Sequence, residues 1–203
     1  MQTIFTFAYI IERMETIEDN LDPAQSLQMI TEVIARTKEN IKNHSFLFLL
    51  WGWLITVASF SFFILHTYTA FKLFFLPFPV LALTGIIISV LHFTGKQYES
   101  ETYLGYYLKR LWVVLGISFI LVVFINLITT QLPFTYTLLI GGIGTTVSGL
   151  VLRFRPLVLG GILFLLSSVA SVFTPDAYKP LLQGIAFIAG YLIPGYLLKH
   201  SKI

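Results

Sequence analysis

Six continuously apolar stretches, each about twenty residues long, constrain this chain more than any other feature of its sequence. A bilayer has a hydrocarbon core about 30 Å thick, which an α-helix of roughly 20 residues crosses. The stretches are apolar throughout rather than alternating, and a helix satisfies its own backbone hydrogen bonds in lipid, so helices rather than barrel strands are predicted. The six predicted transmembrane helices cover residues 45–65, 73–94, 111–128, 134–152, 156–173 and 181–198. Helix-compatible spacing in ESETYLGYYLKRLW predicts that the third helix starts earlier and projects about two turns beyond the lipid.

Composition agrees with a lipid environment for the domain at 44–203. Apolar residues make up 56% of the chain and charged residues only 11%, which is too few charges to cover a soluble domain of this size. The chain has no cysteine, so disulfides and thiolate metal sites are excluded. Its net charge of +3 lies in short clusters between the apolar stretches, which indicates membrane topology and not a nucleic-acid partner.

The distribution of Lys and Arg predicts the orientation of the helices. Of the 13 basic residues, only Lys72 and Lys179 fall in connections on one side, and the remaining eleven fall on the other. Cytoplasmic connections carry the excess of basic residues, so both termini are predicted to be cytoplasmic in a multi-pass protein. The eleven are Arg13, Arg36, Lys38, Lys42, Lys96, Lys109, Arg110, Arg153, Arg155, Lys199 and Lys202.

The N-terminal tail, residues 1–21, is predicted to carry no signal peptide. Its first thirteen residues contain a short apolar stretch without a basic leader or a small-residue cleavage site. Met14 opens a polar segment, METIEDNLDP, that resembles an ordinary soluble N-terminus. The sequence therefore leaves Met1 and Met14 as alternative starts.

A cytoplasmic amphipathic helix is predicted at 22–43. Asp22 and Pro23 suit an N-cap and a first helical turn, and the apolar residues that follow recur every three or four positions. The polar face mixes both charges, which favours a protein surface over lipid as its contact. We expect the helix to pack on the loop at 95–110, with a second copy of the same helix in a homo-oligomer as the alternative. The candidate docking residues are Leu27, Ile30, Ile34 and Ile41 on the helix, and Tyr98, Tyr103, Tyr106 and Tyr107 on the loop.

Small residues mark the last three predicted helices as closely packed. Gly141, Thr145 and Gly149 recur at four-residue spacing, and Gly161 and Gly190 follow in the next two helices. Small residues let membrane helices approach each other, so these glycines are candidate helix-packing residues. A broken-helix substrate site near Pro194 is the alternative, but its place near a span end favours a kink. Ser148, Ser167, Ser168 and Ser171 are predicted to hydrogen-bond between helices.

The sequence predicts no catalytic, cofactor or metal site. No acidic residue falls inside a predicted span, and the chain has neither an HExxH nor a GxSxG motif. The serines have no embedded His or Lys to activate them. His44, His66, His92 and His200 lie at span ends without the helical spacing of a metal-ligand pair.

One stretch carries a family resemblance. The segment TKENIKNHSFLFLLWGWLITVASF, with DPAQSLQMI before it, resembles the corresponding part of an uncharacterised family of bacterial six-helix integral membrane proteins. The resemblance covers residues 22–60, while the later helices match in hydropathy only. It implies a bacterial inner membrane, and it carries over no activity, cofactor or site residue. A loose association of that family with transcription regulators hints at signalling.

Three functions remain open on these grounds. The first is a non-enzymatic scaffold or sensor that docks a protein partner on its cytoplasmic face, where most polar residues lie. The second is a small permease or channel with a glycine-rich C-terminal half. The third is an enzyme with catalytic groups from the cytoplasmic rim, such as Glu99, Glu101 or His92. The first is preferred because no ionisable side chain falls near the middle of a span.

Overall fold

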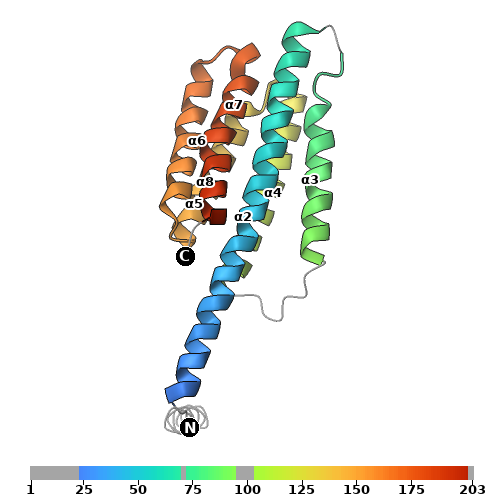
Figure 1. The fold of residues 1–203 in the computed structure, drawn as a ribbon. Coiled ribbons are helices and arrows are strands. Elements are labelled where there is room, and N and C mark those ends of the chain that lie inside the picture. The colour runs from blue at the N-terminus through green and yellow to red at the C-terminus, as the bar shows by residue number, and fades with distance from the viewer. Residues whose placement is uncertain (1–22, 70–71, 95–102, 201–203) are drawn as a thin grey trace, which may run out of the picture. The chain divides into compact units, whose positions relative to one another are not determined.

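Every regular element in the described part of the chain is a helix, which confirms the all-α class. The computed structural model describes residues 23–69, 72–94 and 103–200. It divides into two compact units at 1–39 and 40–203, and each is described by itself. The elements are α2 (Pro23–Tyr68), α3 (Pro77–Thr94), α4 (Tyr103–Ile128), α5 (Phe134–Val151), α6 (Arg155–Phe173), the short 3₁₀ helix η1 (Asp176–Tyr178), α7 (Lys179–Phe187), the π-helical segment η2 (Ile188–Leu192) and α8 (Ile193–His200) (Figure 1).

Five helical stretches within the described residues are long and apolar enough to cross a membrane. The apolar part of α3, Pro77–His92, is a shorter sixth stretch. The chain is therefore a multi-pass helical membrane protein whose apolar helices contact the lipid bilayer. The five long stretches are Ser45–Tyr68, Gly105–Ile128, Phe134–Val151, Arg155–Phe173 and Asp176–His200.

The helix predicted to start at residue 73 begins four residues later. The backbone at 72–76 forms turns, in which the Leu76 N–H donates to the Leu73 carbonyl oxygen at 3.1 Å. Pro77 then opens α3. Proline has no N–H to donate and its fixed φ suits the first turn of a helix, so the helix starts at the proline rather than at the first apolar residue.

The predicted amphipathic helix and the first predicted span form one continuous helix, α2. Its first residue is Pro23, as expected for a first-turn proline. The side chains of residues 23–44 lie outside the described part, and so do Tyr98 and the side chain of Tyr103. The candidate docking residues Leu27, Ile30, Ile34 and Ile41 therefore remain a prediction. Residues 103–110, in the connection at 95–110, belong to α4, which confirms the predicted early start of the third helix.

Two helices end in the same tight turn, and neither uses glycine. At the end of α5, Arg153 has a φ of 52°, and the Phe154 N–H donates to the Gly149 carbonyl oxygen at 2.9 Å. Thr130 has a φ of 55° at the end of α4, where the Gln131 N–H donates to the Asn126 carbonyl oxygen at 2.9 Å. The position with positive φ at such a helix end is usually occupied by glycine. The turn lets α6 start within a few residues of the end of α5.

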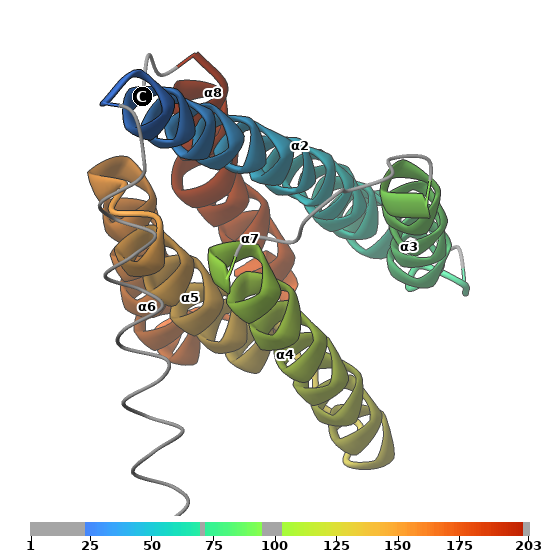
Figure 2. The ribbon, with the colours of Figure 1, turned by 90° about the horizontal axis from the view of Figure 1, so that it is seen from below.

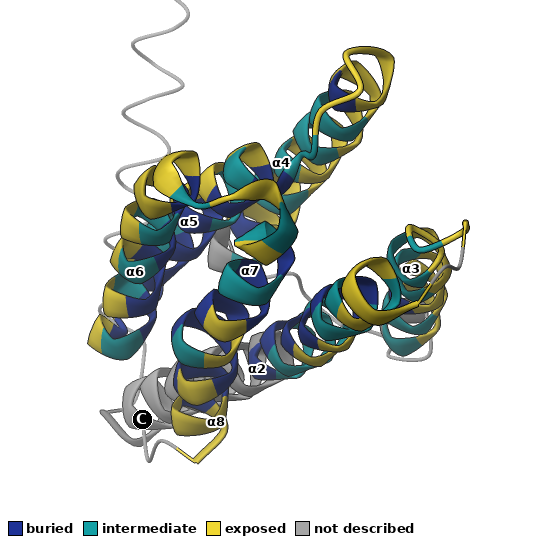
Figure 3. Cartoon of the chain, turned by 90° about the horizontal axis from the view of Figure 1, so that it is seen from above, coloured by how far each residue is buried: buried dark blue, intermediate teal, exposed yellow. Residues whose placement is uncertain are grey.

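Helix packing is tightest in the C-terminal half. α5 and α6 make the most extensive contact, α4 packs on α5, and α7, η2 and α8 pack on α6 (Figure 2). Most of α4 is exposed (Figure 3). Large apolar side chains such as those of Ile120 and Leu127 are among its exposed residues. In a membrane protein such a surface is in contact with lipid chains.

Candidate functional site

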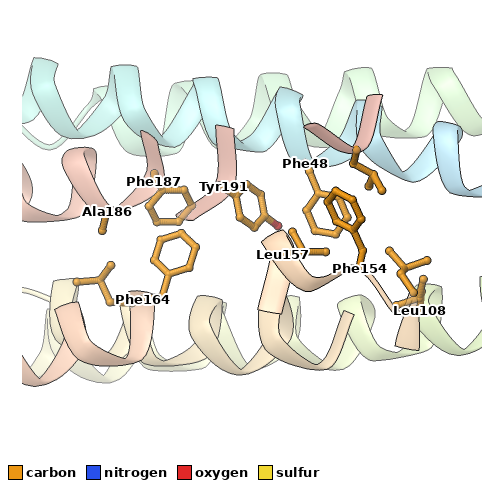
Figure 4. Close-up of a cluster of buried hydrophobic side chains, with 11 residues drawn as sticks. Phe48, Leu108, Phe154, Leu157, Phe164, Ala186, Phe187 and Tyr191 are labelled. Carbon is orange, nitrogen blue, oxygen red and sulfur yellow. The ribbon is translucent and has the colours of Figure 1, made fainter. Parts of the chain in front are cut away.

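Tyr191 occupies the centre of a buried aromatic cluster that joins four parts of the chain. The centroid of its ring lies 5.1 Å from that of Phe48 on α2, 5.8 Å from that of Phe164 on α6 and 5.5 Å from that of Phe187 on α7 (Figure 4). It also lies 6.3 Å from the ring centroid of Trp112 on α4. Most of these pairs are edge-to-face, the arrangement that aromatic rings prefer. The cluster fixes the last span against the rest of the bundle.

The last span changes to a π-helical turn at this cluster. The sequence predicts a kink near Pro194, and the structure has a π-helical segment over Ile188–Leu192, just before the proline. Pro194 has no N–H to donate to the Gly190 carbonyl, which favours a wider turn at this point. A β-carbon at Gly160 would collide with that carbonyl oxygen, so α6 and η2 meet backbone to backbone.

Three of the four predicted packing glycines lie against another backbone. A β-carbon at Gly149 would lie 2.6 Å from the backbone N of Val158, and one at Gly190 would lie 2.8 Å from the Gly160 carbonyl oxygen. At Gly161 it would collide with the backbone and side chain of Thr146. The structure therefore brings helices α5, α6 and η2 within the distance that only glycine permits at these positions.

The fourth predicted glycine, Gly141, differs from the expected ridge. A β-carbon there would meet only Phe187 Cζ at 3.9 Å, an ordinary contact distance. The closer contacts belong to its neighbours on other faces of α5, where Gly142 lies against Leu165 and Gly144 against Leu115. The four-residue spacing identified the helix correctly, but it could not show which face of α5 meets α6.

The hydrogen bonds predicted between helices are confirmed for three of the four serines, and no such bond is observed for Ser167 within the described part of the chain. Trp112 Nε1–H donates to Ser148 Oγ at 3.1 Å, which links α4 to α5. Ser168 Oγ–H donates to the Thr135 carbonyl oxygen at 2.9 Å, and Ser171 Oγ lies 2.6 Å from Thr135 Oγ1. These bonds hold α6 against the first turn of α5.

A buried amide, which sequence reasoning missed, lies close to this group. Gln183 on α7 is 1% exposed, and its Oε1 lies 2.9 Å from Thr137 Oγ1 on α5. The signal in the sequence was a single glutamine inside the last apolar stretch. On the inner face of α2, Thr56 and Ser59 are also buried. All buried polar side chains in the described part are neutral hydroxyls or amides.

The first turns of α4 carry exposed aromatic and basic side chains. The rings of Tyr106 and Tyr107 meet edge to face with centroids 6.2 Å apart, and Arg110 Cζ lies 5.2 Å from the centroid of the Tyr106 ring. Lys109 is exposed beside them. We call these four residues the α4 cluster. Its guanidinium and phenol groups are amphipathic surface of the kind enriched in protein interfaces.

The histidines with described side chains make separate contacts. His92 stacks on Phe46 with ring centroids 4.1 Å apart, His66 stacks on Phe62, and His200 Nδ1 lies 2.9 Å from the Tyr196 carbonyl oxygen. Within residues 45–69, 72–92 and 105–200, no three His, Asp or Glu side chains come together as a metal site would require.

Comparison with known protein families, with curated proteins and with solved structures finds no match in any of the three. Function must therefore be argued from the residues themselves. The described structure offers two features for that argument, the exposed α4 cluster and the buried neutral polar groups of α2, α5 and α7.

Proposed function

We propose that this chain is a non-enzymatic membrane scaffold or sensor that docks a protein partner on its cytoplasmic face. The observation that supports this is the α4 cluster, in which Arg110 holds the Tyr106 ring while Tyr107 is 53% exposed. Arg and Tyr are among the residue types enriched at the positions that dominate binding energy in protein interfaces. The buried polar side chains, by contrast, are neutral groups suited to helix packing.

This proposal includes six spans with both termini in the cytoplasm of a bacterial inner membrane. The apolar part of α3 would be the additional span, and basic residues would face the cytoplasm at four places along the chain. The family resemblance at 22–60 supports the bacterial membrane. The α4 cluster then lies at the cytoplasmic end of the third span.

Reporter fusions test this topology. Because Pro133 falls between α4 and α5 and Ile203 ends the chain, a reporter fused after Pro133 is expected outside the cytoplasm and one fused after Ile203 inside. Alkaline phosphatase and green fluorescent protein activities measure the two sides. A third fusion after Arg153 serves as a control and is expected inside. Equal activity of the same reporter after Pro133 and after Ile203 would refute the proposed number of spans.

Site-specific photo-crosslinking tests the docking surface. A photoreactive amino acid in place of Tyr107 is expected to give a discrete protein adduct in cells, because that side chain lies in the proposed interface. Tyr178 is the matched control, since it is a tyrosine of equal exposure, 54% against 53%, at the opposite end of the spans. The adduct is read on a denaturing gel and its partner is sequenced by mass spectrometry.

The Arg110→Glu variant completes this test. Reversing the charge beside Tyr106 is expected to abolish the Tyr107 adduct, because a rim charge of the wrong sign opposes association. Adducts of the same size at Tyr107 and Tyr178, or an adduct that survives Arg110→Glu unchanged, would rule out specific docking at the α4 cluster.

A small permease or channel for uncharged solutes is the second candidate. The observation that favours it is the group of buried neutral polar side chains on α2, α5 and α7, which includes Thr56, Thr137 and Gln183. Neutral hydroxyls and amides suit an uncharged solute better than an ion. Absence of any Tyr107 adduct, together with solute flux in proteoliposomes, would favour this candidate over the scaffold.

A further inference from the structure

Two hydroxyls on the inner face of α2 have no hydrogen-bond partner within the described part of the chain. They are Thr56 Oγ1 and Ser59 Oγ, on residues that are 4% and 0% exposed. Other threonines of the bundle satisfy their hydroxyls within their own helix, as Thr145 does by donating to the Gly141 carbonyl oxygen at 2.6 Å. A buried hydroxyl without a partner is costly, so the difference at Thr56 and Ser59 needs a cause.

The two hydroxyls lie at the level of the bundle where α2 meets α7 and α5. A β-carbon at Gly184 on α7 would lie 3.1 Å from Phe60 Cε2 on α2. The rings of Phe62 and Phe134 lie 5.3 Å apart and join α2 to the start of α5. Ser59 is fully buried, and in α2 it directly precedes Phe60 and lies three residues before Phe62. Gln183 is the residue directly before Gly184 on α7, and its amide contacts Thr137 on α5.

Gln183 has hydrogen-bonding capacity that its one partner does not use. Thr137 Oγ1 lies 2.9 Å from both Gln183 Oε1 and the Phe134 carbonyl oxygen, and a hydroxyl has a single proton to donate. The amide of Gln183 offers donors and acceptors beyond that contact. Its neighbours Gly184 and Ala186 are buried and small, as is Ala58 on α2.

We propose that Thr56, Ser59 and Gln183 bind a small uncharged hydrogen-bonding molecule between α2 and α7. Water is the smallest such ligand. Thr56 and Ser59 are three residues apart on one helix face, so a single molecule reaches both hydroxyls. A buried water makes two to four hydrogen bonds, about the number that these three side chains supply. The ligand is uncharged because no charged side chain is buried among the described residues to compensate an ion.

This site is independent of the α4 cluster and of the partner proposed to dock there. Its test uses the full chain in lipid nanodiscs with hydroxyl-radical footprinting, in which a bound water is activated by X-rays and oxidises the side chains beside it. The segment Phe60–Phe62 is expected to be oxidised, which is diagnostic at Phe62 because that ring is buried. Phe164, fully buried among aromatic rings, is the internal control and is expected to stay unmodified.

Variants connect that signal to the site. Thr56→Val and Ser59→Ala are each expected to remove most oxidation of Phe60 and Phe62 and to lower the melting temperature by roughly 2–4 °C. Thr145→Val is the matched control, because this buried hydroxyl already donates within α5, and it is expected to leave the oxidation unchanged. Thr56→Ser keeps the hydroxyl and is expected to keep the signal, which separates loss of the site from loss of folding.

Two further arms identify the ligand. Oxygen-18 incorporated after irradiation in labelled water identifies the ligand as water, and a rise in melting temperature with added glycerol identifies a larger hydroxylated solute. The proposal is overturned if Phe60 and Phe62 stay unoxidised and glycerol has no effect. It is also overturned if Thr56→Val raises the melting temperature, because removing an unpaired hydroxyl from a dry site is stabilising.

Discussion

Replacing Gly149 by leucine is expected to destabilise the folded protein by about 3 kcal/mol, the upper end of the range for overpacked interiors. A β-carbon at this position would lie 2.6 Å from the backbone N of Val158 and 3.0 Å from the carbonyl carbon of Leu157. Backbone atoms of α6 cannot rotate out of the way as a side chain does, so α5 and α6 would have to separate. Thermal unfolding in mild detergent, monitored by size-exclusion chromatography, measures the loss of stability.

Two controls isolate the contact from the general effect of substitution. Gly141→Ala adds a methyl group on the same helix, where the nearest atom is 3.9 Å away, so it is expected to be tolerated while Gly149→Ala is not. Leu150→Ala removes a side chain that is 61% exposed to lipid and is expected to cost less than Gly149→Leu. Equal stability of the Gly141 and Gly149 variants would show that α5 and α6 do not meet as described.

Replacing Phe164 by alanine is expected to cost about 3–5 kcal/mol of stability, the range for removing a buried phenylalanine. Phe164 is fully buried, and its ring centroid lies 4.7 Å from that of Phe187 and 5.8 Å from that of Tyr191. Its loss leaves a cavity between α6 and the last span that backbone contacts at Gly160 and Gly190 prevent from closing. Denaturation in mixed detergent, monitored by circular dichroism, gives the free energy of unfolding.

Phe173→Ala is the matched control for this prediction. Phe173 lies on the same helix and is 84% exposed, so its ring contacts lipid and not another helix. Lipid chains restore most of the contacts that are lost with the ring. The free energy of unfolding is therefore expected to change by no more than about 0.5 kcal/mol. Phe164→Leu keeps most of the side-chain volume, so its loss of stability is expected to lie between those of Phe164→Ala and Phe173→Ala. A Phe173 variant as unstable as the Phe164 variant would contradict the burial described for α6.

The class of fold could be predicted from the sequence because the membrane leaves few alternatives. Any apolar stretch of the required length must close its own hydrogen bonds in lipid, so span length and position follow from local sequence. The predicted ends at 134–152 and 156–173 differ from α5 and α6 by one residue each. The later start of α3 was also a local effect, since Pro77 alone determines it.

The buried site was harder to predict from the sequence, because it depends on the faces that helices turn toward each other. Thr56 and Thr145 are both buried threonines in apolar stretches, yet only Thr145 donates its hydroxyl within its own helix. In the sequence, Gln183 is a single polar residue in the last apolar stretch. Only the structure shows that it lies beside Thr137 of α5. Hydropathy shows that such residues enter the membrane but not which partner they find there.

The sequence by itself determined that this chain is helical, apolar and lipid-embedded, because those properties sum over residues without regard to their partners. Only the tertiary structure decided that Gly142, Gly144 and Gly160 make close contacts while Gly141 does not. Glycines four residues apart lie on one face of a helix, but the rotation of that helix about its axis is set by all its neighbours together. The left-handed turn at Arg153 was decided in the same way, since closing α5 onto α6 requires it whatever residue stands there.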